Sequence, residues 1–498
     1  MDQGYCVFKH ISCTLCISIG LLLSTCFFDY FYCSNSYAQD YNDSITRQRS
    51  DAFGLNSPAH VNVNNPDIEP IHTPNPSRHK TSADGRLSLR NYVSGDSSQT
   101  YESPTLFLSF LEADLHLKDI TSSGLRLDID STFILDVSQA NERRFGETER
   151  FDQVRQLALS QNFGALKLSF GRRLITESGN AWVDGIDLKY HLKKSYTAIG
   201  IYGGLSPDRF DRSLTLDYQA LGLYVEYQKR PLSLNLAYNV LLFEGSLDRQ
   251  FLYQRTHYRI IEGLFASNYL ILDFVDEPQI TTFLSTLDYT PIKALNLSIN
   301  LSQYSLEQYR NQTIYRDIIE PNQALILGNE VINLSYQRLR LSGAWWFNPK
   351  LRSYVSTELK SRAQDGRQAY IYTAGINHTD LLNSKIDLDL QLQIAQNFRT
   401  DTIIVALSAR RDLGSQFSLD ARLSSFSGEL LDDGTDRQGL FNEAQRIFLF
   451  GVSAIGRITR AHQVLATYDG VYESEIADYK SDEAITIHTL SFFYSYLY

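Results

Sequence analysis

The chain has 498 residues, a formal net charge of -11, a pI near 5.4 and a mean hydropathy of -0.25. Hydropathy this low leaves no room for many apolar helices of about 20 residues, which excludes a helical membrane protein. The 31 Tyr, 27 Phe and 3 Trp exclude a disordered chain, and the acidic balance opposes nucleic-acid binding. A soluble multidomain protein or a β-rich chain with alternating apolar residues remains.

The first 38 residues have the features of a secretory signal peptide. Lys9 precedes an apolar stretch over residues 11–28, and the small residues Ser36 and Ala38 predict cleavage after Ala38. All five cysteines lie within the first 33 residues, so the exported chain is expected to contain none. Two alternatives are an uncleaved membrane anchor and a lipoprotein cut before Cys26.

Residues 39–83 are expected to form a Pro- and Asn-rich periplasmic linker. This stretch holds five of the twelve prolines and shows no sustained apolar period. Such a composition buries too little surface to offset the entropy lost on ordering, which predicts a disordered N-terminal segment. A spacer is the simplest role, and contact with a partner is the alternative.

From residue 84 to the end, apolar residues recur at every second position in runs of about ten. A period of two places one apolar and one polar face on a β-strand. The clearest runs are residues 125–137, 232–239, 295–302 and 386–394, and weaker ones are residues 105–117, 165–173, 220–228, 403–410 and 417–423. No helical period of similar strength competes, so the region is predicted to be all-β.

The length of these runs and their aromatic ends favour a membrane barrel over a soluble sandwich. Runs of this length match the 9–11 residues of a tilted transmembrane strand. Aromatic residues recur near the predicted strand ends, as in the girdles of outer-membrane barrels: Phe107, Phe110, Tyr190, Tyr196, Tyr224, Tyr227, Tyr253, Tyr289, Trp345, Trp346, Phe347, Tyr370, Tyr372, Phe448, Phe450 and Tyr468. Since strands in lipid must close to satisfy their backbone, we expect an antiparallel up-and-down barrel over residues 84–498.

The last predicted strand places Leu490, Phe492, Tyr494, Tyr496 and Tyr498 on one face and ends on an aromatic residue. This resembles the C-terminal sorting signal of Gram-negative outer-membrane β-barrels. The resemblance implies recognition by the outer-membrane barrel assembly machinery and residence in the bacterial outer membrane, in contact with its lipid and glycolipid. The alternative is an ordinary amphipathic edge strand, which would expose adjacent aromatic residues to water.

The number of strands follows from length. At about 20–25 residues for a strand and its connection, the region predicts 16–20 strands, and we expect 18. Longer polar stretches at residues 138–150, 204–214, 309–329 and 429–442 are candidate outside loops.

A barrel of this width typically encloses an aqueous path whose lining selects what passes. Alternation predicts a mixed-charge lining made of Arg126, Asp128, Asp130, Arg173, Asp187, Lys189, Glu226, Arg340, Glu358, Lys360, Asp387, Asp389, Arg410, Asp420 and Arg422. Similar numbers of both signs suit a polar or weakly selective channel. The alternative is that many of these charges only pair with neighbours along the wall.

The segment Phe170-Gly171-Arg172-Arg173, followed by Trp182-Val183-Asp184-Gly185, resembles a pair of strands in alginate-export-type, porin-like barrels. In that family arginines line a conduit for an anionic polysaccharide, which implies a pore-lining role for Arg173 and, less directly, for Arg172. Alternation by itself turns Arg172 outward, in phase with Phe170.

Enzymatic and metal-dependent functions have little support in the sequence. The histidines lack the spacing of a metal site, and no Gly-x-Ser-x-Gly or phosphate-binding glycine motif is present. We therefore expect no enzyme activity, cofactor or metal. The leading hypothesis is a porin-like channel for small polar or charged solutes, and the alternatives are a polysaccharide-export or surface-assembly barrel and an outer-membrane hydrolase.

Overall fold

The computed structural model describes residues 81–96, 106–121, 123–136, 153–192, 195–207, 212–274, 278–305, 335–363, 366–398, 400–430, 445–474 and 485–497. The chain divides into two units, residues 1–70 and 71–498, and all described residues belong to the second. Ala38 and Tyr498 lie outside the described residues, as do residues 1–80, which include the predicted signal peptide and most of the predicted linker.

The described residues form 22 strands and two short 3-10 helices, η1 (Thr176–Ser178) and η3 (Leu381–Asn383). The first eleven strands are β1 (Ser82–Asp96), β2 (Leu106–Lys118), β3 (Arg126–Asp136), β4 (Gln153–Phe163), β5 (Leu166–Ile175), β6 (Ala181–His191), β7 (Thr197–Leu205), β8 (Tyr218–Lys229), β9 (Leu232–Phe243), β10 (Ser246–Ile261) and β11 (Leu264–Asp273). The others are β12 (Gln279–Ile292), β13 (Leu295–Ser305), β14 (Ser335–Asn348), β15 (Leu351–Arg362), β16 (Gln368–His378), β17 (Ile386–Gln396), β18 (Thr400–Leu413), β19 (Phe417–Leu430), β20 (Gln445–Arg457), β21 (His462–Ser474) and β22 (Ile485–Leu497).

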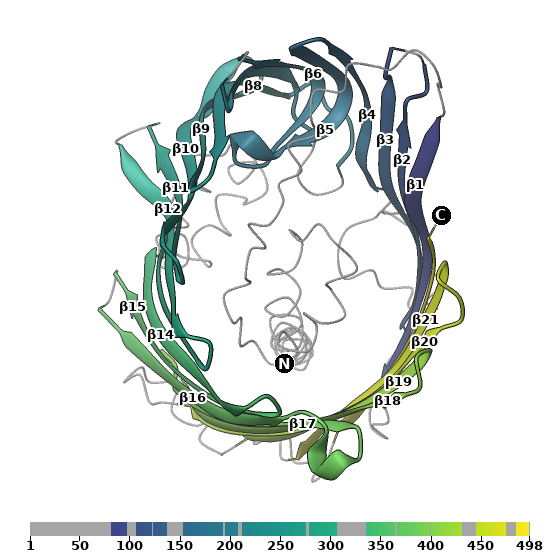
Figure 1. The fold of residues 1–498 in the computed structure, drawn as a ribbon, viewed down its shortest axis with the longest axis vertical. Helices are drawn as coiled ribbons and strands as arrows, with labels where there is room; N and C mark the ends of the chain where they lie inside the picture. The colour runs from purple at the N-terminus through teal and green to yellow at the C-terminus, as the bar shows by residue number, and fades with distance from the viewer. Residues whose placement is uncertain are drawn as a thin grey trace, which may run out of the picture. The chain divides into compact units, whose positions relative to one another are not determined.

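Each strand pairs antiparallel with its neighbours in the sequence, and β1 pairs with β22 from Arg86 opposite Leu497 to Asp96 opposite Ile487. This last pairing closes the sheet into the ring seen in Figure 1. The prediction of an all-β, antiparallel, closed barrel is confirmed, and the strongest alternating runs coincide with β3, β9, β13 and β17.

The predicted number of 18 strands is wrong, because the connections are shorter than assumed. Residues 82–498 are 417 residues, so each of the 22 strands takes about 19 residues with its connection. Several hairpins turn in two residues, such as Glu244 and Gly245, whose φ angles of 48° and 80° suit a tight turn of the type that matches strand twist.

Connection length distinguishes the two ends of the barrel. Every connection that follows an even-numbered strand has two to seven residues, whereas the longest on the other end, residues 306–334, has 29. Outer-membrane barrels have short periplasmic turns and long extracellular loops. By that rule β1 begins and β22 ends at the periplasmic end.

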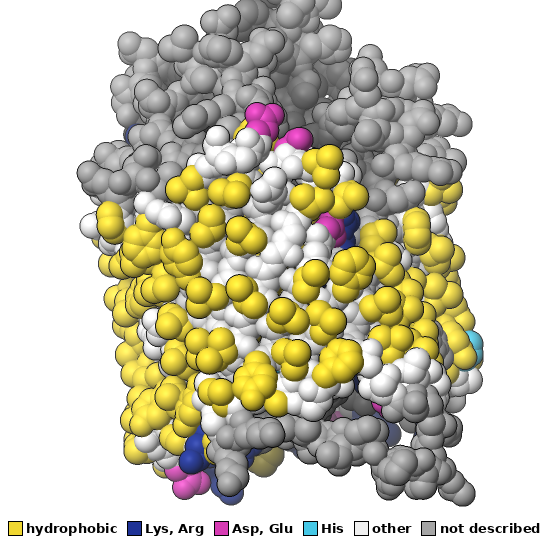
Figure 2. Space-filling view, turned by 90° about the horizontal axis from the view of Figure 1, so that it is seen from above, with side chains coloured by type: hydrophobic (Ala, Val, Ile, Leu, Met, Phe, Trp, Pro, Cys, Tyr) yellow, Lys and Arg dark blue, Asp and Glu magenta, His cyan; other side chains and the backbone are white. Residues whose placement is uncertain are grey.

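The outward face of the barrel is an apolar belt. Outward side chains at alternate positions are apolar and exposed, for example Ile199 (45%), Leu223 (51%), Leu301 (45%), Val355 (60%) and Leu392 (43%). Figure 2 shows one side of this face, with hydrophobic side chains spread over the wall and few charged groups among them. On a soluble protein an exposed apolar area this large would cause aggregation. A strand wall in contact with the hydrocarbon of a bilayer, in contrast, needs an apolar outer surface.

Aromatic side chains gather near both edges of this belt. Near the short-turn end lie Tyr190, Tyr258, Tyr289, Trp345, Phe417 and Tyr496, and towards the other end lie Phe133, Tyr372, Phe448 and Tyr472, all outward and exposed. Four residues assigned to these girdles from the sequence, Phe110, Tyr224, Tyr253 and Trp346, instead stand at inward positions, and Tyr224 and Tyr253 are fully buried. The first three share the phase of the inner-face residues Glu112, Glu226 and Arg255, and Trp346 stands opposite inward Arg352.

No helix within the described ranges is long and apolar enough to cross a bilayer.

Arginine substitutions at two adjacent positions of β17, made one at a time, test which face of the wall contacts lipid. Leu392 lies outward near the middle of the strand and Gln393 lies inward. Leu392→Arg is expected to lower the free energy of unfolding in bilayers by about 2–4 kcal/mol, since it places a cation in hydrocarbon. Gln393→Arg is the matched control and should change it little. Equal effects in urea titrations would contradict a lipid-covered outer face.

Candidate functional site: the inner face of the barrel

The inner face carries polar and charged side chains on most strands, apart from an apolar cluster on β7–β10. The fifteen charged residues predicted for the lumen all stand at inward positions, in alternation with the exposed apolar residues of the belt. The structure thus gives the direction in which these fifteen side chains point. Contact between these side chains and a solute is a separate prediction, which is proposed below.

Most of these charges are held in pairs along or between strands. The following contacts join predicted residues: Arg126–Asp128 (2.8 Å), Arg173–Asp187 (2.9 Å), Lys189–Glu226 (2.5 Å), Lys360–Glu358 (3.0 Å) and Arg422–Asp420 (3.4 Å). Other predicted residues contact partners outside the predicted set. Asp130 contacts Arg155 (2.7 Å), Arg410 contacts Asp412 (3.5 Å), and Asp389 accepts a hydrogen bond from the Tyr354 hydroxyl (2.9 Å). Arg340 has no partner within the described ranges.

The tip of the β5–β6 hairpin leaves the wall and folds over the inner face. Pairing of β5 with β4 stops at Arg172, and pairing of β6 with β7 starts at Asp184, so residues 173–183 have no neighbouring strand outside the hairpin. Within this tip, η1 packs against β8 and β9, and Figure 1 shows it on the inner side of that wall. We call residues 173–183 the hairpin tip.

An apolar cluster fixes the hairpin tip to the wall. Ile175 and Val183 of the tip are buried together with the inner-face residues Tyr202, Ala220, Tyr224, Ala237, Phe251 and Tyr253. At its centre, the Ser178 and Tyr202 hydroxyls, 3.1 Å apart, both donate to Asn239 Oδ1. Burial of this many apolar side chains makes the tip part of the core rather than a free loop.

Glycines opposite the buried tyrosines make the close packing possible. A Cβ atom on Gly200 would lie 2.1 Å from the ring of Tyr224, and one on Gly222 would lie 2.5 Å from the ring of Tyr202. The Tyr224 hydroxyl then donates to Asp187 (2.9 Å). Side chains at either glycine would therefore displace a ring from the cluster.

Lys189 connects the hairpin tip to the wall by charge. Its ammonium contacts Glu177 of η1 at 2.8 Å and Glu226 of β8 at 2.5 Å, and all three side chains are at most 15% exposed. Burial raises the pKa of Glu177, but the nearby Lys189 lowers it further, to about 2. Glu177 is therefore ionised at neutral pH, and it was not predicted because it lies in a turn outside the alternating strands.

Arg172 lies on the outward side, as alternation predicts, and not in the inner lining that the family resemblance implied. It forms a bidentate pair with Asp184 directly opposite on β6, and both side chains are 12% exposed. It also donates to the Val154 carbonyl of β4 (2.9 Å), where β4 has no β5 partner. Arg172 thus holds the wall together beside the departing tip.

A basic sector lies on β14 and β15. Towards the end of these strands away from their two-residue turn, four inward cations, Arg338, Arg340, Lys360 and Arg362, lie around the single acid Glu358, which Arg338 approaches at 3.9 Å. A fifth inward cation of β15, Arg352, lies beside the turn and is not part of the sector. No charged residue occupies the inward positions of β13 and β16 beside them. The sector therefore carries a net charge of +3.

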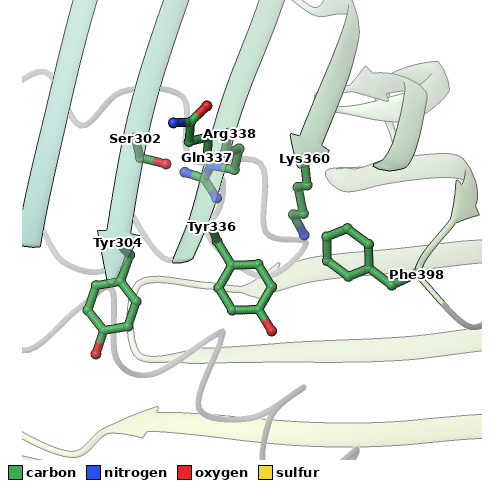
Figure 3. Close-up of a pocket in the computed structure, with 7 residues that line it drawn as sticks. All are labelled: Ser302, Tyr304, Tyr336, Gln337, Arg338, Lys360 and Phe398. Atoms are coloured by element: carbon green, nitrogen blue, oxygen red, sulfur yellow. The ribbon is translucent and has the colours of Figure 1, made fainter. Parts of the chain in front are cut away.

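The basic sector borders a hollow of about 280 Å³. Ser302, Tyr304, Tyr336, Gln337, Arg338, Lys360 and Phe398 line it, and Figure 3 shows them coming from β13, β14, β15 and the β17–β18 connection. The Tyr336 and Phe398 ring centroids are 5.8 Å apart. Arg338 and Phe398 were not selected from the sequence, although Arg338 shares the phase of Arg340.

The described residues contain no group of three or more His, Cys, Asp or Glu side chains arranged to hold a metal ion.

Comparison with known proteins gives only distant likenesses. No family model and no curated protein matches the chain. Among solved structures, OccAB2 of Acinetobacter baumannii is 10% identical, with 84% of this chain and 98% of that one covered and a TM-score of 0.43. OccK5 (OpdH) of Pseudomonas aeruginosa is 9% identical over 84% and 98% (TM-score 0.41), and OccK2 (OpdF) of the same organism, in complex with glucuronate, is 12% identical over 84% and 98% (TM-score 0.36).

Likenesses this distant decide nothing about a solute, so the barrel's own residues carry the functional argument. Its outer face suits hydrocarbon and its inner face suits water. The chain is built as a closed antiparallel β-barrel with an outer face suited to a membrane.

Proposed function

We propose that the barrel is a channel of the Gram-negative outer membrane through which small polar or charged solutes pass along the inner face. The observation that carries this proposal is the division of the wall into a largely apolar outer face and an inner face on which charged residues of many strands stand. Charges of both signs on the inner face give a solute hydrogen-bonding and ionic partners throughout the passage. No observation in the described residues favours a polysaccharide exporter, a surface-assembly barrel or a hydrolase.

The proposal includes the route by which the chain reaches that membrane. We propose a signal peptide cut after Ala38, a periplasmic linker from residue 39 to the start of β1, two residues before the predicted end at 83, and an assembly signal made of Phe492, Tyr494, Tyr496 and Tyr498. In β22, Phe492 and Tyr496 are outward and more than a third exposed, which supports contact with lipid or with the assembly machinery.

Ion conduction tests the proposal directly. The purified barrel, inserted into planar bilayers, is expected to give stepwise ion currents, and proteoliposomes should swell in sugars and amino acids small enough to enter. A correctly folded barrel that gives neither current nor uptake would contradict the channel.

The basic sector predicts a preference for anions. Reversing two of its charges with Arg338→Glu and Lys360→Glu changes its net charge from +3 to -1, so the reversal potential in a salt gradient is expected to shift towards cations. The shift should shrink at high salt, because screening shortens the reach of these charges. Lys350→Glu, in the exposed β14–β15 turn, is the control and should shift it little. A reversal potential unchanged by the double variant would place the selective region elsewhere on the inner face.

A further inference from the structure

The outward face of β10–β12 interrupts the apolar belt with a row of polar side chains. Phe251 and Tyr253 of β10 are buried in the inner cluster, and Tyr269 and Ile271 of β11 pack against it. Strand alternation therefore turns the residues of the opposite phase, among them Gln254 and Thr256 on β10 and Asn268 on β11, towards the outside.

Strand register aligns these residues near the middle of the wall. Asn268 stands opposite Thr256 on one side and opposite Ser285 of β12 on the other. Gln254 lies two residues before Thr256 on the same strand and points to the same face. We call Gln254, Thr256, Asn268 and Ser285 the polar row, and each of them is partly exposed.

Four of the six side-chain hydrogen-bonding groups in the polar row bond to one another, and two do not. The Gln254 side-chain amide donates to Thr256 Oγ1 (2.9 Å), and the Ser285 hydroxyl donates to Asn268 Oδ1 (2.7 Å). The side-chain oxygen of Gln254 and the side-chain amide of Asn268 have no partner within the described part of the chain. Polar groups facing hydrocarbon without partners are costly, and in membranes such groups join protein surfaces.

We propose that the polar row is the contact surface for a second copy of this chain in the membrane. The two unpartnered groups are an acceptor and a donor, so the row is complementary to itself: Asn268 of each copy faces Gln254 of the other. A two-fold axis along the membrane normal produces this arrangement, since an isologous contact repeats each interaction twice. The flanking Leu236, Leu270 and Leu301 would then pack around the hydrogen bonds.

A second outward pair of an asparagine and a serine, Asn91 and Ser109, serves as a control. On β1 and β2, the Ser109 hydroxyl donates to outward Asn91 (2.8 Å), with the exposed Leu89 and Leu111 on the same face. This pair forms no extended row with its neighbours Val93 and Phe492.

Cysteine cross-linking tests the proposal, because residues 34–498 contain no cysteine. The full chain with its five cysteines, all within residues 1–33, replaced by serine and with Leu270→Cys added, purified and reconstituted into liposomes, is expected to form a disulfide-linked dimer on mild oxidation. The same experiment with Val405→Cys, an outward belt residue of β18, should leave monomers. Equal yields of disulfide-linked dimer for the two variants would overturn the proposal.

Two further variants connect the cross-link to the polar row. Adding Gln254→Leu and Asn268→Leu to Leu270→Cys is expected to abolish most of the dimer, and adding Asn91→Leu should leave it intact. Heat-modifiable gel mobility verifies that each variant is folded. Undiminished dimer in the leucine variant would overturn the role of the amides. Channel conductance has no part in these readouts, so their failure is distinct from failure of the proposed channel.

Discussion

Replacing Lys189 with methionine is expected to release the hairpin tip from the inner wall. The change leaves Glu177 and Glu226 beside each other without the ammonium that both contact at 2.8 Å or less. Breaking a buried ion pair from one side costs about 3–5 kcal/mol, because an uncompensated charge remains in a poorly solvated place. We expect single-channel currents that are larger and fluctuate between levels, in contrast to the steady current of the parent barrel.

Chemical labelling of a cysteine measures the release of the hairpin tip independently of the ion current. Ser178 is fully buried, so a Ser178→Cys barrel should react slowly with a membrane-impermeant maleimide and quickly once Lys189→Met is added. Lys118→Met is the matched control, since Lys118 and its partner Asp84 are 41% and 52% exposed and such pairs contribute little. Equal labelling with and without Lys189 would show that apolar contacts alone hold the hairpin tip.

A valine at Gly200 is expected to lower the free energy of unfolding by about 3 kcal/mol, the upper part of the range for an overpacked core. Its Cβ would overlap the ring of Tyr224. The ring has to move, which breaks the bond from its hydroxyl to Asp187 and opens the cluster under the hairpin tip. The midpoint of urea unfolding in lipid vesicles measures the loss.

Gly343→Val provides the control for this substitution. Gly343 also lies within a strand, but its Cβ would meet only the end of the Leu297 side chain, at 3.3 Å. That side chain can rotate away, so the loss of stability should be small. A similar loss for both variants would show that the general cost of valine in place of strand glycine, and not the Tyr224 contact, governs stability.

The facing of side chains was predictable because alternation is a local property of the sequence. The same phase that places Leu390 and Leu392 outward places Asp387 and Asp389 inward, and no knowledge of neighbouring strands is needed. Strand number was not predictable from the same pattern, since it depends on connections whose lengths range from two residues to 29.

The hairpin tip could not be predicted, because its position depends on distant partners. Residues 176–180 read as an ordinary five-residue connection. Their place is fixed by contacts with Tyr202, Asn239 and Tyr253, which are 24 to 74 residues away in the sequence and converge only once the register of β7–β10 is set. The burial of Tyr224 was missed for the same reason, since only cross-strand register shows that Gly200 stands opposite its ring.

The pairing of β1 with β22 has a consequence for biogenesis. Twenty-one of the strand contacts join neighbours along the chain, but the remaining one brings Arg86 against Leu497 across about 400 residues. The entropy lost on closing so long a loop is recovered only when the final strand docks. A polypeptide arrested before β22 would present two unsatisfied edges, at β1 and at β21, so insertion has to await completion of synthesis and some factor has to shield those edges until then.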